Sequence, residues 1–225
     1  MPLRKRTHTT VSDRFPVHNN KKTSQIRRTI AAEAARIMST QSLSNYRVAK
    51  QKAVERLGIN LRTTMPSNAE VESALRAYQG VYGGQRHIRR LREMRGVALS
   101  VMRSLELFNP RLVGSVLEGT ADENTRVSIH VFYDPPDAVV IHLLDRGLVF
   151  RNEQRKIRWH DGRYRQVQLL VTDAQDIEVE LILFNCIDLR QAPPSPVDGR
   201  PQKRAPLSEV ESLLADISQR DSSGT

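Results

Sequence analysis

Cysteine, aromatic residues and long apolar runs are all scarce in this chain of 225 residues. The single cysteine, Cys186, excludes an internal disulfide, and its place in an apolar run predicts a reduced core residue. No apolar run reaches the roughly 18 residues that a membrane helix needs. The basic N-terminus is not followed by an apolar run, so no secretory signal is expected. These absences predict a soluble, cytoplasmic protein with no membrane partner.

Acidic residues are scarce in the N-terminal part of the chain. Residues 1–64 hold 14 Lys and Arg against 3 Asp and Glu, whereas residues 65–225 hold 21 against 22. The net charge of +10 therefore arises in the N-terminal part. Such asymmetry is typical of contact with RNA or another polyanion. A solubilising surface explains it equally well, because Phe15 and Tyr46 are the only aromatic residues there that could stack on bases.

The composition divides the chain into four segments. A basic, aperiodic tail over 1–23 is predicted to be disordered, and a helical region follows over 24–84. A mixed domain is predicted over 85–189, and a Pro-rich segment with a short C-terminal helix over 190–225. The long segment 85–189 is the one in which we expect the functional site.

Apolar spacing and capping residues predict the helices of the chain. Ser67 and Glu70 form a capping-box pattern, and Ser42 or Ser44 is expected to start the helix that ends at Gly58. The predicted helices span 24–39, 44–57, 68–82, 85–107, 136–146 and 207–218.

Alternating and apolar runs predict strands between the last three helices. Asp161-Gly162 is a hairpin turn signal between two of them. The predicted strands span 111–114, 126–133, 148–150, 155–160, 164–171 and 177–184. Together with the helices they predict an α+β protein.

A glycine-serine motif stands where helices give way to strands. Val113-Gly114-Ser115 is followed by Glu118-Gly119-Thr120-Ala121, and then by an alternating run from Arg126. A glycine at a strand–helix junction lets backbone N–H groups approach a phosphate closely, and a serine hydroxyl adds a donor. The motif therefore predicts a phosphate-binding turn at Gly114 and Ser115.

This pattern resembles the DNA-polymerase-beta-like nucleotidyltransferase superfamily, in particular its minimal members, over about residues 86–185. The layout also resembles a group of bacterial proteins. The resemblance implies a mixed sheet with flanking helices, preceded in this chain by a helical N-terminal region. It also implies nucleotide binding at the glycine-serine turn, with two Mg²⁺ ions held by an Asp-x-Asp pair and a third acid.

The chain departs from the family where metal binding is expected. Arg126 and Ser128 stand at the Asp-x-Asp positions, and a shift of two residues gives Ser128 and His130 instead. None of these side chains is a carboxylate, and Mg²⁺ requires hard oxygen ligands. Glu180 matches the family's third, catalytic acid, with Glu178 on the same strand face as the alternate candidate. One carboxylate cannot hold two Mg²⁺ ions.

The first hypothesis is a nucleotidyltransferase-fold protein with impaired catalysis that binds nucleotide or RNA. Glu180 would then persist as an ion-pair partner of Arg126. The nucleotide-binding candidates are Gly114, Ser115, Arg126, Ser128 and His130.

Two other hypotheses stay open. One is an active transferase that binds Mg²⁺ through atypical ligands, namely Glu118, Glu178 and Glu180 with Asp122. The other is a non-enzymatic interaction module whose basic helical N-terminus docks on nucleic acid or protein. A cofactor, Mg²⁺, is expected only if the site is active.

Overall fold

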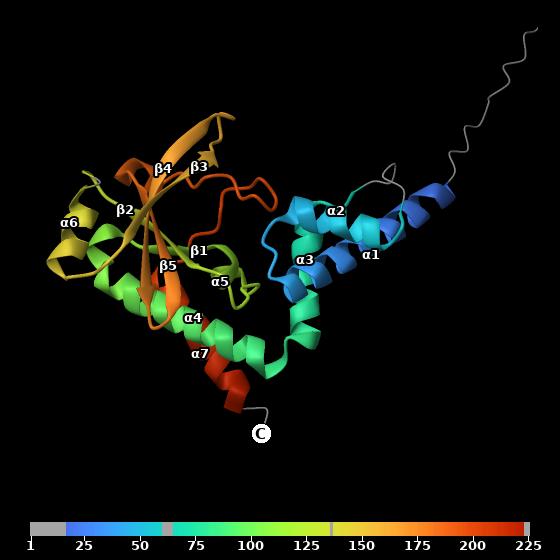
Figure 1. Cartoon of the computed structure of the whole chain (residues 1–225), viewed down its shortest axis with the longest axis horizontal. Coiled ribbons are helices and arrows are strands. Elements are labelled where there is room, and N and C mark those ends of the chain that lie inside the picture. Colours follow the sequence, from blue (N-terminus) through green and yellow to red (C-terminus); the bar gives the residue numbers. More distant parts are fainter. Residues whose placement is uncertain (1–16, 60–64, 136, 223–225) are drawn as a thin grey trace, which may run out of the picture.

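A computed structural model describes residues 17–59, 65–135 and 137–222 of the chain. In these residues five strands form one mixed sheet in the order β1-β2-β5-β4-β3 (Figure 1). β2 and β5 are parallel, and the other neighbouring pairs are antiparallel. The α+β class is confirmed. The strands are β1 (Arg111–Val113), β2 (Val127–Phe132), β3 (Arg151–Arg158), β4 (Tyr164–Ala174) and β5 (Ile177–Phe184).

Helices and short 3-10 turns make up the rest of the described elements. The helices are α1 (Val17–Gln41), α2 (Tyr46–Arg56), α3 (Asn68–Tyr82), α4 (Gly84–Ser104), α5 (Gly114–Glu118), α6 (Asp137–Asp145) and α7 (Leu207–Ser222), and the 3-10 turns are η1 (Glu106–Phe108) and η2 (Cys186–Leu189).

The sheet has two chemically different faces. Because side chains alternate along a strand, Ile129 and Val131 of β2 face the main core, which α4 and α7 cover from one side (Figure 1). Ser128 and His130 face the opposite side. That opposite face carries a smaller apolar cluster around Phe132 and a row of charged residues, so it is the face on which a site can form.

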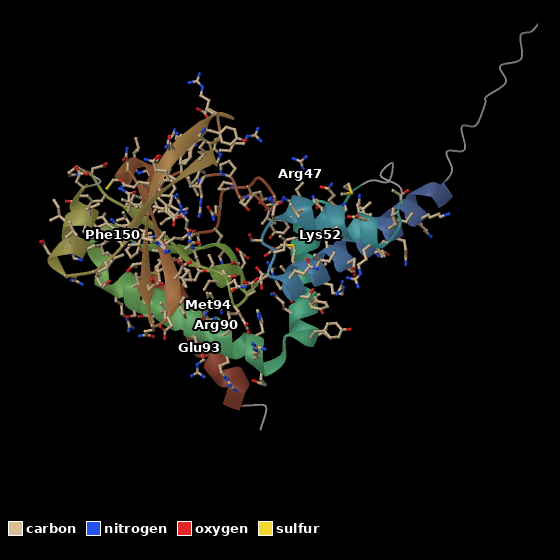
Figure 2. All side chains as sticks on the ribbon, in the orientation of Figure 1. Arg47, Lys52, Arg90, Glu93, Met94 and Phe150 are labelled. Atoms are coloured by element: carbon tan, nitrogen blue, oxygen red, sulfur yellow. The ribbon has the colours of Figure 1, made fainter. Side chains whose placement is uncertain are left out.

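Helix α4 covers one face of the sheet with its apolar side. Met94 is fully buried against the sheet, whereas Arg90 and Glu93 form an ion pair of 3.5 Å toward solvent (Figure 2). Apolar residues at helical spacing thus give α4 one buried side.

The N-terminal helices form a second core. Ile30 of α1, Ala49 of α2 and Val71 of α3 are fully buried there. Ser67 and Glu70 make the predicted capping box at the start of α3. This helical unit meets the sheet domain at α5, where Arg76 reaches Glu118.

Several local predictions are wrong. α1 begins at Val17, inside the predicted disordered tail; the rest of that tail, 1–16, lies outside the described residues. Asn45 caps α2 in place of Ser42 or Ser44, because its side chain accepts from two backbone N–H groups of the first turn. β3 begins only at Arg151, so 148–150 is not a strand.

Cys186 is also not the core residue that the sequence predicts. It is a free, exposed cysteine in η2, directly after the buried strand β5. The buried run ends at Phe184, and Asn185 is the N-cap of the 3-10 turn that contains Cys186.

The C-terminal segment belongs to the sheet domain. Ala205 pairs with Leu112 of β1, and Val210 of α7 is fully buried in the main core beside α4. Within the described residues, no helix combines the length and the apolar character needed to cross a membrane.

Candidate functional site

The glycine-serine turn joins β1 to α5. Gly114 has φ of +73°, the left-handed conformation that glycine adopts without a steric penalty. A Cβ atom at Gly114 would lie 3.9 Å from the Ser128 Oγ, so the turn lies next to the start of β2. The sequence predicted this junction, and the neighbouring strand follows from the pairing of Val113 with Ser128.

A buried arginine fixes the far end of α5. The guanidinium of Arg95, from α4, donates to the carbonyl oxygens of Val116 and Leu117 at 3.1 Å each. These carbonyls belong to the last turn of a helix, where no intrahelical donor follows. Burial lowers the pKa of Arg95. The short helix, and with it the glycine-serine turn, is held by this contact.

Pairing of β2 with β5 brings Ser128 beside Glu180. The two residues are register partners in the parallel pair, and the Ser128 hydroxyl donates to Glu180 Oε1 at 2.7 Å. Gly114, Ser128 and Glu180 therefore meet at one point on the open face. The sequence analysis expected Ser128 and Glu180 to lie near this turn.

Arg126 stands directly before β2 and contacts three carboxylates. Its Nε donates to Glu178 at 2.8 Å and its Nη1 donates to Glu153 at 3.1 Å. Glu180 lies farther away, 3.9 Å from Arg126 Nη1. The expected Arg126–Glu180 pair is thus only a long contact, and the main partner of Arg126 is the alternate acid Glu178.

A different arginine, Arg155 of β3, is the main partner of Glu180. Its Nη1 and Nη2 donate to the two carboxylate oxygens at 3.0 and 2.7 Å, the bidentate geometry that guanidinium favours. Arg151, on the same strand, pairs with Glu178. Sequence reasoning missed Arg151, Glu153 and Arg155. The available signal was their i, i+2, i+4 spacing, which places them on one face of a strand.

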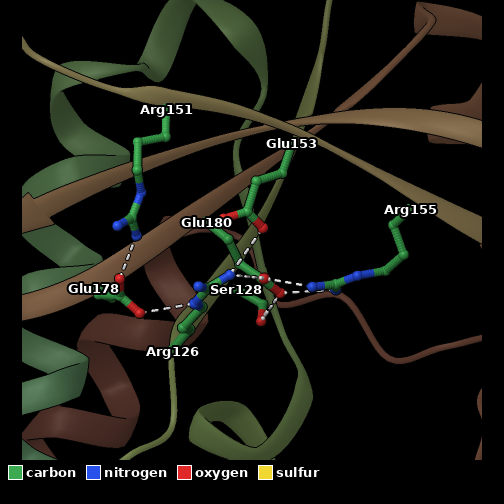
Figure 3. Close-up of polar contacts among 7 residues, drawn as sticks. All are labelled: Arg126, Ser128, Arg151, Glu153, Arg155, Glu178 and Glu180. Atoms are coloured by element: carbon green, nitrogen blue, oxygen red, sulfur yellow. Dashed lines mark hydrogen bonds and ion pairs between the residues drawn. The ribbon is translucent and has the colours of Figure 1, made fainter.

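These seven side chains form one connected network across β2, β5 and β3 (Figure 3). Three arginines meet three glutamates, so the formal charges of the network cancel. The Glu178 pKa lies below its ordinary value because Arg126 and then Arg151 hydrogen-bond its ionised form. Hydrogen bonds to Glu178 and Glu153 likewise raise the pKa of Arg126, against the effect of burial.

The donor set does not fit the Mg²⁺ ions that the resemblance implies. Every carboxylate in the network already has an arginine partner, and Arg126 would repel a divalent cation. In the described part of the chain, no group of three or more His, Cys, Asp or Glu is placed to hold a metal ion. The alternative ligands Glu118 and Asp122 line a neighbouring cavity and do not join Glu180.

His130 lies at the floor of the site as a buried, neutral residue. It is 1% exposed, and its Nδ1 accepts from Arg204 Nε at 3.0 Å. Desolvation, followed by the charges of Arg204 and Arg155, places the His130 pKa well below its ordinary value. Burial also lowers the pKa of Arg204, to about 10. His130 therefore has a structural role at the floor of the site, and its ring is too buried to donate to a ligand.

An open cleft of about 590 Å³ lies above this floor. Its lining includes Gly114, Ser128 and Glu180 on one side and Arg155, Lys156 and Arg158 of β3 on another. Lys156 and Arg158 have no acidic partner among the described residues, but they alternate with Arg155 along this edge strand, so they border the cleft whereas the Arg155 guanidinium faces it. Arg126 and Ser115 are not part of this lining. Ser115 lines a separate cavity next to the cleft.

No protein-family model matches this chain, and no curated protein matches it in sequence.

Proposed function

We propose that this chain has a nucleotidyltransferase-type fold in which the transfer chemistry is impaired. The order of elements supports the fold: β1, a left-handed glycine turn, the short α5, then β2 with β5 parallel beside it. The meeting of Gly114, Ser128 and Glu180 supports it further. These observations agree with the sequence motif from which the resemblance was drawn.

We further propose that the cleft binds an anionic ligand of the nucleotide class. The observation that carries this proposal is a half-exposed arginine, Arg155, beside Glu180 in the cleft. Arg155 is bound to Glu180 and is still 45% exposed, so its guanidinium can meet a phosphate as well as the carboxylate. Lys156 and Arg158, from the other face of this edge strand, add positive charge only at the border of the cleft. A phosphate there would also lie near the backbone of the Gly114 turn.

Impaired chemistry follows from the same contacts. Two-metal transfer needs ions that bridge the triphosphate and activate the attacking hydroxyl. The network offers guanidinium groups, which bind phosphate without lowering the pKa of a hydroxyl nucleophile as a metal does. The protein is therefore expected to bind the ligand and release it unchanged.

The test measures binding and transfer side by side. Calorimetry with ATP, GTP, CTP and UTP is expected to give binding, while labelled nucleotides with Mg²⁺ or Mn²⁺ and RNA or protein acceptors give no transfer. Arg155→Met is expected to weaken binding about tenfold or more, since it removes a charge-assisted contact. Arg151→Met is the matched control, because Arg151 pairs with a carboxylate on the same strand but does not line the cleft.

Two outcomes would overturn this proposal. Label transfer that Glu180→Ala abolishes would establish an active enzyme. If none of the four nucleotides binds, nucleotide binding is excluded and the non-enzymatic interaction module is favoured.

A further inference from the structure

The arginine-lined cleft continues into a second cavity. This cavity, of about 240 Å³, lies between the helical unit and α5, and it shares Gly114, Ser195, Pro196 and Gln202 with the cleft. The Pro-rich segment thus forms a wall common to both, and the glycine-serine turn stands at their junction. A ligand bound at the turn can extend into either space.

The two spaces have opposite charge. The cleft presents the guanidinium of Arg155 and is bordered by Lys156 and Arg158. The second cavity presents the carboxylates of Glu72, Glu118 and Asp122. Its one lysine, Lys203, is paired with Glu209 at 2.8 Å. A ligand that fills both spaces therefore carries negative charge at one end and hydrogen-bond donors at the other.

Glu72 is the most constrained acceptor of the cavity. It is 6% exposed, and its two oxygens accept from the hydroxyls of Tyr46 and of Thr120, the latter at 2.9 Å. The nearest guanidinium, that of Arg76, is 3.9 Å away and also forms an ion pair with Glu118. The carboxylate is thus oriented by neutral groups and only partly compensated in charge, which leaves it able to accept further donors.

A second buried acceptor points to the same ligand chemistry. Gln79 also lines the cavity and is 6% exposed; its amide nitrogen donates to the Thr120 carbonyl at 3.2 Å. Its Oε1 is buried without a hydrogen-bond partner among the described residues. A buried acceptor without a donor is costly, so a donor-bearing ligand would be stabilised here.

We infer that the second cavity binds the base of a guanine nucleotide while the arginine-lined cleft binds its phosphate; this inference rests on the proposed function. Guanine presents two adjacent donors, N1–H and N2–H, which one carboxylate can accept together. Adenine and cytosine place a ring acceptor beside their amino donor, and uracil has a single N–H between two carbonyls. Of these four bases, only guanine can place two donors against the Glu72 carboxylate without also placing one of its own acceptors there.

The experiment compares GMP with IMP, which lacks the 2-amino group, and with AMP and UMP. GMP is expected to bind about 10–100-fold more tightly than IMP, as befits one charge-assisted hydrogen bond. Glu72→Gln is expected to weaken GMP binding more than IMP binding, because IMP keeps N1–H but lacks the second donor that the carboxylate accepts, so the preference for GMP should be lost. Glu55→Gln, an exposed site on α2 that does not line the cavity, is the control.

The outcomes separate the two proposals. Equal affinity for GMP and IMP in the wild-type protein overturns the guanine inference and leaves nucleotide binding intact. Failure of all four nucleotides to bind overturns the proposed function itself. The wild-type ligand series decides the matter even if Glu72→Gln fails to fold.

Discussion

At the scale of single residues, charge pairing defines this site. Glu180 is nearly buried and accepts from Ser128 and from both terminal nitrogens of Arg155. Removing one partner of such a pair leaves a buried charge uncompensated, which costs more than the pair itself contributes. Arg126 and Arg155 therefore stabilise the acids of β5 by pairing with them.

Introducing an Asp-x-Asp pair tests the proposed relation to the nucleotidyltransferases. In a variant combining Arg126→Asp with Ser128→Asp, the two new carboxylates join Glu180 on one face of the sheet. We expect this variant to bind Mg²⁺ more tightly than the wild-type protein, as measured by calorimetry. A variant with Arg126→Asn and Ser128→Asn controls for the loss of the native contacts. A folded Asp variant without Mg²⁺ affinity would contradict the proposed register.

His130 predicts a pH dependence of stability. Its folded-state pKa is well below 6.5, whereas the unfolded chain protonates it near that value. As the pH falls below about 6.5, the unfolded state takes up a proton that the folded state does not. The free energy of unfolding should then fall by up to about 1.4 kcal/mol per pH unit.

Urea unfolding between about pH 7.5 and 5.5 measures this slope. The carboxylates with lowered pKa, such as Glu70 and Glu178, lose their contribution only at lower pH, as it falls toward and below 4.5. In the variant His130→Gln, whose amide can still accept from Arg204, the slope should be flatter. Equal slopes in both proteins would show that His130 does not control it.

At the scale of elements, the junction of β1 and α5 sets the position of the site. A strand of three residues leads directly into a helix of five, and Gly114 makes the change of direction in a left-handed conformation. Arg95 holds the end of the helix, while the sheet holds its start. So short a helix is not stable by itself, and these contacts keep it in place.

Two glycine substitutions of opposite expected sign test this element. Gly114→Ala forces a side chain into the left-handed region and should lower the free energy of unfolding by about 1–2 kcal/mol. Gly80→Ala, in the exposed part of α3 with no atom within 4 Å of the new Cβ, should raise it by about 0.5–1 kcal/mol. Thermal unfolding of both variants gives the comparison. A stabilised Gly114→Ala protein would contradict the geometry of the turn.

At the scale of the whole molecule, a basic helical unit stands beside a sheet domain of balanced charge. The two units meet at α3 and α5, where Glu72, Gln79 and Arg76 contact the α5 segment. Arg47 and Lys52 lie exposed on α2 of the helical unit (Figure 2). Contact with RNA through this surface remains a prediction from the charge distribution.

The salt dependence of RNA binding tests that prediction. In a variant combining Arg47→Gln with Lys52→Gln, single-stranded RNA should bind more weakly, because two phosphate contacts are lost. The slope of log K against log salt should fall by about 1.4, at roughly 0.7 per contact. Arg103→Gln, an exposed site on α4 paired with Glu211, should leave the slope unchanged. An unchanged slope in the α2 variant would exclude this surface.

The sequence by itself predicted most of the described helices and strands and the glycine turn between β1 and α5. Period-2 alternation and the local signals at Ser67, Gly114 and Gly162 predict β5, the capping box and both turns, because such signals act over a few residues. Predictions at element ends, as at Asn45, were less accurate because several nearby residues could cap the same helix.

Only the tertiary structure decided which charges meet. Arg155 lies 25 residues before Glu180 in the chain, and only the antiparallel order β5-β4-β3, two strands across, brings them to hydrogen-bonding distance. The second cavity depends likewise on docking of the helical unit against α5, which places Glu72 beside Thr120. Pairings of this kind result from long-range packing, for which a single sequence carries no local signal.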